Sequence, residues 1–101
     1  MKNLRCVRIE YTIRPEVALD ELKGAITAFV DGIRAHDAGS RYTSYQIAGD
    51  ERRFVHVGEF AEEVVPSLQE QSFFRQFTAF LRERCAEGPV VTALARVATT
   101  R

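Results

Sequence analysis

The 101-residue sequence has no tryptophan, only two cysteines and two histidines, and no excess charge of either sign, since fourteen basic and fourteen acidic side chains cancel. Balanced charge gives no basic footprint for nucleic acid, so we expect no such partner. Cys6 and Cys85 are too few for a disulfide framework, and we expect two reduced thiols. Two distant histidines and two distant cysteines lack the spacing of metal ligands, so no metal site is predicted.

Long apolar runs are also missing. No segment approaches the ~18 apolar residues of a membrane span, and residues 1–15 hold no run long enough for a signal peptide. We therefore expect a cytoplasmic protein without a membrane partner. A glycine-rich phosphate loop, a GxSxG elbow and a dinucleotide fingerprint are absent as well, which argues against kinases, hydrolases and flavin or nicotinamide enzymes. No cofactor is expected.

Four segments have the composition or alternation of β-strands. They are residues 4–13, 41–48, 54–60 and 90–98. The predicted apolar face of the first comprises Val7, Ile9, Tyr11 and Ile13, and that of the second comprises Thr43, Tyr45 and Ile47. Gly49-Asp50-Glu51 predicts a hairpin turn between the second and third strands.

Two segments have helical periodicity, and the length of the chain predicts one domain, 1–101. Residues 16–36 carry an apolar stripe at three- and four-residue steps. Residues 69–87 carry four phenylalanines and follow a predicted short helical turn before Pro66. Gly88-Pro89 is expected to end this second helix.

The element order is strand, helix, strand, strand, helix, strand, which predicts an α+β, ferredoxin-like βαββαβ fold. Both helices then cover one face of a four-stranded antiparallel sheet. The opposite face is predicted to carry Cys6, Arg8, Glu10, Thr12, Ser44, Gln46, Phe54, His56, Phe60, Leu94 and Arg96. This mixture is too apolar for ordinary solvated surface, and we expect a second copy to pack on it, sheet to sheet, as a homodimer.

The element order, the chain size and the run FVHVGEF…SLQEQSFFRQF resemble the antibiotic biosynthesis monooxygenase-type domain of the dimeric α/β-barrel superfamily. The resemblance implies a homodimeric barrel with its ligand in a cleft between sheet and helices. Activities in the family include cofactor-free oxidation of quinol-like aromatics and haem degradation. The chain departs from the haem-degrading members in lacking tryptophan and in having Thr78 where they have the iron ligand, and Leu68 and Phe73 stand where many members have histidines.

His56 is the predicted catalytic residue, because a histidine near its usual pKa can carry a proton at neutral pH. The alternative is a structural interface histidine held by Glu10. Arg8, Glu10 and Arg96 are predicted to orient an anionic or phenolic ligand. Their alternative role is an ion-pair network across the dimer.

Tyr11, Tyr45 and Phe77 are predicted to line an aromatic ligand cleft, with the hydroxyls fixing the ligand's orientation. The alternative is that these rings belong to the core. We therefore expect a homodimeric barrel that binds a small aromatic or amphipathic molecule, as a cofactor-independent monooxygenase of phenolic or quinol-like aromatics. A non-catalytic ligand-binding or stress-associated protein and a lactone isomerase-like enzyme are the alternatives.

Overall fold

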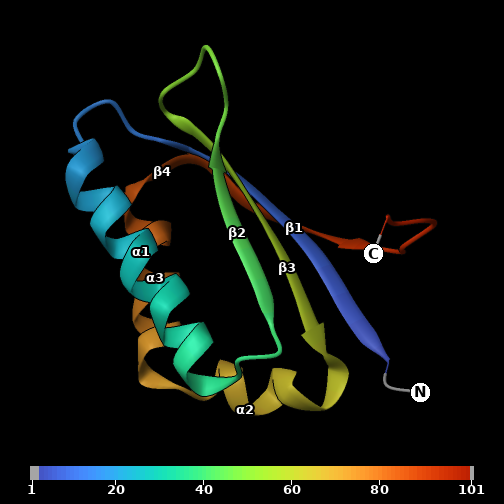
Figure 1. The fold of residues 1–101 in the computed structure, drawn as a ribbon. Helices are drawn as coiled ribbons and strands as arrows, with labels where there is room; N and C mark the ends of the chain where they lie inside the picture. Colours follow the sequence, from blue (N-terminus) through green and yellow to red (C-terminus); the bar gives the residue numbers. More distant parts are fainter. Residues whose placement is uncertain (1–2, 101) are drawn as a thin grey trace.

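The computed structural model describes residues 3–100 as a sheet covered on one side by helices (Figure 1). The elements are β1 (Leu4–Ile13), α1 (Leu19–His36), β2 (Arg41–Gln46), β3 (Arg53–Ala61), η1 (Glu62–Val64), α2 (Val65–Gln69), α3 (Ser72–Arg84) and β4 (Cys85–Leu94). The sheet has the order β2-β3-β1-β4, and all neighbouring strands are antiparallel. The predicted βαββαβ order and α+β class are therefore confirmed.

The helical layer consists of α1 and α3, which lie side by side against the sheet, while the short α2 lies at the end where β3 leaves it (Figure 1). The predicted stripe of α1 is buried through Leu22, Ile26, Phe29 and Ile33. Phe77 and Leu81 are its buried counterparts on α3. Among the helices that the structure describes, none is long and apolar enough to cross a membrane.

Several boundaries differ from the predictions. The helix predicted over 69–87 corresponds to α3, which begins at Ser72 and ends at Arg84. Gln69 is the last residue of the separate helix α2, and Pro66 lies in the first turn of α2 rather than before a helix. A proline is tolerated there because first-turn N–H groups have no helical partner. β4 begins at Cys85, directly after α3, so Gly88-Pro89 lies within the strand. The Arg14 N–H bonds the Arg84 carbonyl at this junction.

The predicted orientation of β3 is wrong. Phe54, His56 and Phe60 face the helices, with exposed fractions of 2%, 0% and 6%, and Val55 and Val57 lie on the uncovered face. Because side chains alternate with period two, choosing the wrong set reverses every residue of a strand. The error arose because both sets of β3 are apolar.

The predicted orientation of β2 is wrong for the same reason. Register with β3 pairs Ser44 with His56 and Gln46 with Phe54, which places these two residues on the helix face rather than on the uncovered one. Tyr45 pairs with Val55 and is 55% exposed on the uncovered face. Directly opposite residues of paired strands share a face. The register between β2 and β3 therefore determines which residues of both strands face the helices.

Candidate functional site

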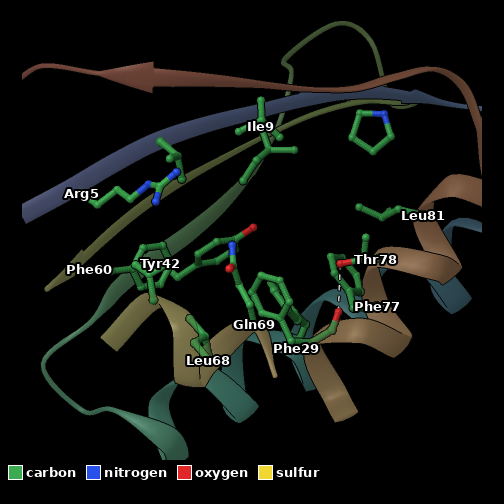
Figure 2. A pocket seen from close by; sticks show the side chains of 15 residues that line it. Arg5, Ile9, Phe29, Tyr42, Phe60, Leu68, Gln69, Phe77, Thr78 and Leu81 are labelled. Carbon is green, nitrogen blue, oxygen red and sulfur yellow. Dashed lines mark hydrogen bonds between the residues drawn. The ribbon is translucent and has the colours of Figure 1, made fainter. Parts of the chain in front are cut away.

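A cavity of about 270 Å³ lies between the helix face of the sheet and helices α2 and α3 (Figure 2). Its lining is largely apolar and aromatic, and comprises Arg5, Val7, Ile9, Phe29, Tyr42, Phe60, Val65, Leu68, Gln69, Phe74, Phe77, Thr78, Leu81, Pro89 and Val91. Ligand sites usually combine such an apolar lining with a few polar groups that fix orientation. The volume is slightly below the usual range of about 300–1,000 Å³ for ligand pockets, which suits a small ligand.

Aromatic rings form one wall of the cavity. Phe29 of α1 and Phe77 of α3 are stacked, with ring centroids 4.2 Å apart. Tyr42 meets Phe29 edge to face at 5.3 Å. Offset and edge-to-face pairs of this kind stabilise each other beyond the area they bury. A flat aromatic ligand would therefore meet ring faces and edges on this side.

Polar groups are few in the lining. Tyr42 reaches from the sheet side into the space between sheet and helices, and Gln69 and Thr78 approach from α2 and α3 (Figure 2). The Thr78 hydroxyl donates to the Phe74 carbonyl at 3.0 Å. Arg5 brings an exposed guanidinium group to the rim. Among residues 3–100 there is no group of three or more His, Cys, Asp or Glu side chains that could hold a metal ion.

Behind Tyr42 lies His56, whose exposed fraction is 0%. The Tyr42 hydroxyl is 2.8 Å from His56 Nδ1, and the Tyr11 hydroxyl is 2.8 Å from His56 Nε2. Both ring nitrogens are therefore hydrogen-bonded, which is what a buried imidazole requires. Figure 2 shows the Tyr42 end of this chain, which is the part that lines the cavity.

Burial sets the protonation of the three groups. It lowers the pKa of His56 to about 4, so the imidazole is neutral at pH 7. Burial also raises the pKa of Tyr42, and burial followed by the proximity of Tyr42 and Cys85 raises the pKa of Tyr11. The chain Tyr42–His56–Tyr11 is therefore uncharged at neutral pH.

Gly58 makes room for the Tyr42 ring. The two residues are paired across β2 and β3. A Cβ atom at Gly58 would lie 3.0 Å from Tyr42 Cδ2 and 2.7 Å from Phe60 Cε2. The absence of a side chain at Gly58 therefore lets both rings lie across β3, with the Tyr42 hydroxyl on His56.

The structure brings together three of the predicted site residues and separates the others from them. Tyr11, His56 and Phe77 share the helix side of the sheet, and the His56 and Phe77 rings are stacked at 6.1 Å. Tyr45 is on the opposite face, so its predicted place in the helix cleft is wrong.

The charged residues of the predicted site also lie on the uncovered face. Glu10 accepts from Arg53 Nε at 2.6 Å and lies 3.6 Å from Arg8 Nη2. Arg96 pairs with Glu59. His56 is thus held by Tyr11 and Tyr42 and not by Glu10, which contradicts the alternative that made it an interface histidine.

Tyr42 is the residue of the candidate site that the sequence interpretation missed. Each alternating set of the second strand contains one tyrosine, and the set with Tyr45 and Ile47 is the more apolar. The other set holds Tyr42, whose hydroxyl is hydrogen-bonded to Nδ1 of His56 on the next strand. Pairing a buried histidine with the tyrosines around it would have identified this face.

Comparisons with known proteins agree with this architecture at the level of structure. No family model matches the sequence, and no curated protein sequence matches it. Rv0793 from Mycobacterium tuberculosis superposes with a TM-score of 0.81 at 20% identity, over 98% of this chain and 100% of that one. A structure described as an antibiotic biosynthesis monooxygenase gives 0.77 at 16% identity, over 95% and 100%.

A variant of SnoaB, a cofactor-independent oxygenase from Streptomyces nogalater, gives a TM-score of 0.80 at 12% identity over 96% of each chain. At such identities the likeness shows the fold alone. The chain has the ferredoxin-like fold of antibiotic biosynthesis monooxygenase-type domains, so the resemblance seen in the sequence is confirmed for the fold.

Proposed function

We propose that the protein binds a small aromatic or amphipathic molecule in the cavity between the sheet and helices α2 and α3. The observation that carries the proposal is a largely apolar cavity with a tyrosine hydroxyl, Tyr42, held in place by a fully buried histidine, His56. A buried polar group in an otherwise apolar wall costs stability unless it is paired. The paired hydroxyl therefore supplies a fixed polar contact for a ligand whose rings fill the rest.

Binding is tested by calorimetric titration with 1,5-dihydroxynaphthalene under nitrogen. Wild type is expected to bind one molecule per chain. Thr78→Trp, which projects an indole into the cavity, should abolish binding, whereas Thr27→Trp on the exposed face of α1 should leave it unchanged. Equal binding by both variants would place the ligand elsewhere and refute the proposal.

A second candidate is oxidation of such a phenol by O₂ without a cofactor. The observation that favours it is the Tyr42–His56–Tyr11 chain, which brings hydrogen-bonding groups to the cavity wall. An electron-rich phenolate can itself give an electron to O₂. The expected balance is 1,5-dihydroxynaphthalene plus O₂ to 5-hydroxy-1,4-naphthoquinone plus water, so no external reductant is needed. SnoaB, a solved structure of the same fold, is named as a cofactor-independent oxygenase.

Oxygen uptake separates this activity from binding alone. If the reaction uses the Tyr42 hydroxyl, held by His56, to stabilise the phenolate that forms, His56→Gln should lower the rate by about 10²- to 10³-fold, the usual loss on removing one positioned hydrogen-bond donor. Arg8, Glu10 and Arg96 could hold the ligand only if it contacted the uncovered face. Arg8→Ala tests this role separately from that of His56. Binding without any uptake above the buffer rate would leave a non-catalytic ligand-binding protein.

We also propose that the protein is a homodimer that buries the uncovered sheet face. Large apolar side chains on this face are Tyr45, Val55, Val57, Val90 and Leu94. Tyr45, Val90 and Leu94 are exposed by 55%, 60% and 41%. These side chains flank Arg8 and Glu10 of β1, so a second copy would bury apolar groups on both sides of a charged pair.

A further inference from the structure

We propose that Tyr42 donates a hydrogen bond into the cavity, so that the ligand group beside it is an acceptor oxygen, either a carbonyl or a phenolate. This inference rests on the proposed function for the existence of a ligand, but its first step concerns only the protein. That step is the direction of the hydrogen bonds along Tyr42–His56–Tyr11.

A neutral imidazole carries one N–H and one bare nitrogen. One ring nitrogen of His56 must therefore donate to a tyrosine oxygen, while the other accepts from a tyrosine hydroxyl. Two arrangements satisfy both 2.8 Å contacts. In the first, Tyr11 donates to Nε2 and Nδ1–H donates to Tyr42. In the second, Tyr42 donates to Nδ1 and Nε2–H donates to Tyr11.

The surroundings of Tyr11 distinguish the two arrangements. Tyr11 is 2% exposed, and within residues 3–100 its hydroxyl has no hydrogen-bond partner other than His56. Its ring is stacked on Phe54 at 5.7 Å. If Nε2–H donated to Tyr11, the hydroxyl hydrogen of Tyr11 would have no acceptor, and a buried donor without a partner is costly. Tyr11 therefore donates to Nε2.

The direction of the remaining bond follows. With Nε2 as the acceptor, the proton of His56 resides on Nδ1 and is donated to the Tyr42 oxygen. The hydroxyl hydrogen of Tyr42 is then free, and Tyr42 is the member of the chain that lines the cavity. Burial favours the neutral form of all three groups, so the imidazole carries a single N–H.

The consequence is a preference among otherwise similar aromatic ligands. An aromatic ketone such as 1-tetralone offers an acceptor oxygen to Tyr42, whereas tetralin has the same ring system and offers none. Tyr11 thereby acts as a positioning residue: it fixes the tautomer of His56, and the tautomer fixes the direction in which the Tyr42 hydroxyl points.

Nitrogen-15 NMR of the imidazole tests the protein part without any ligand. His36→Gln leaves His56 as the only histidine of the chain, which makes its two nitrogen signals unambiguous. We expect a protonated Nδ1 and a bare Nε2 at pH 7. A proton on Nε2 would overturn the inference. In Tyr11→Phe the reason for this tautomer is gone, and the share of Nε2–H should rise.

Titration with the two ligands tests the consequence. Wild type should bind 1-tetralone more tightly than tetralin, and Tyr42→Phe should lower the affinity for 1-tetralone about 2- to 10-fold, the usual range for one hydrogen bond. Tetralin affinity should not change, and Tyr45→Phe should change neither. Equal effects of Tyr42→Phe on both ligands would refute the donor role. Failure of both ligands to bind wild type would refute the cavity ligand itself, whereas the NMR result would still decide the tautomer.

Discussion

The hydroxyl of Tyr11 lies 2.8 Å from Nε2 of His56 on the adjacent strand, and both residues are essentially inaccessible to water. Tyr11 lies on β1 two residues beyond Ile9, the residue that pairs with His56, and Tyr11 itself pairs with Phe54. The contact is therefore a diagonal one across the sheet, within reach of long aromatic side chains. This hydrogen bond links Tyr11, through His56, to Tyr42 in the wall of the cavity.

Removing the Tyr11 hydroxyl should destabilise the protein. Tyr11→Phe leaves the buried Nε2 of His56 without its partner, and an unpaired buried acceptor costs about 1–3 kcal/mol. Urea unfolding followed by far-ultraviolet circular dichroism measures the change. Tyr45→Phe removes a hydroxyl from an exposed ring and should change the free energy of unfolding by less than about 0.5 kcal/mol. Equal effects of the two variants would contradict the structural role of Tyr11.

Stability should depend on pH through His56. Its pKa is lowered from 6.5 to about 4 by burial, so between these values the unfolded chain binds more protons than the folded one. The free energy of unfolding should therefore rise with pH over this window, and fall by up to about 3 kcal/mol on acidification through it. His56→Gln should flatten this dependence, whereas His36→Gln, at a half-buried position at the end of α1, should retain it. Urea titrations between pH 4 and 7 compare the three proteins.

Substitution of alanine for Gly58 and for Gly24 should change stability in opposite directions. Gly58→Ala places a methyl group 2.7 Å from Phe60 and 3.0 Å from Tyr42, and such overpacking costs about 1–3 kcal/mol. It should also weaken ligand binding, because the Tyr42 ring must shift. Gly24→Ala on α1 meets nothing within 4 Å and should stabilise the helix by up to about 1 kcal/mol. Thermal unfolding of both variants measures the two changes in stability. If both variants were stabilised, or both destabilised, the result would be inconsistent with the packing at Gly58.

The order of elements could be predicted from the sequence because alternation and helical periodicity are local properties. The orientation of β1 was also predicted correctly, since Ile13 and Tyr11 are buried among the helices. The orientation of β3 was not, because Val55 and Val57 competed with Phe54 and Phe60 as the inward set. Local pattern alone does not determine which of two apolar faces meets the helices.

The candidate site was predicted in part for a related reason. His56 was predicted to be the catalytic residue, but it was placed on the uncovered face together with Arg8 and Glu10. Its burial is made acceptable by two tyrosine hydroxyls from neighbouring strands, and this pairing depends on sheet order and register. A tertiary contact of this kind has no counterpart in local sequence spacing. Tyr42 was missed for the same reason, because the sequence alone does not give the strand register that brings its hydroxyl to His56.

The last prediction concerns the uncovered sheet face. Val57 lies on β3 opposite Arg8 of β1 and Thr43 of β2, near the middle of this face. If a second copy packs there, Val57→Asp buries a carboxylate without a partner and should convert the dimer to a monomer. Analytical ultracentrifugation at micromolar concentration measures the change, and circular dichroism establishes that the variant is folded.

A control separates loss of the interface from a general effect of added charge. Thr27→Asp introduces the same carboxylate on the exposed side of α1, which is on the other side of the sheet, and this variant should remain dimeric. A stable protein–protein interface of standard size buries about 1,200–2,000 Å² in total, and a dimer through the uncovered face should bury an area of this order. A wild-type protein that sediments as a monomer at these concentrations would refute the dimer, and the apolar side chains of this face would then need a different partner.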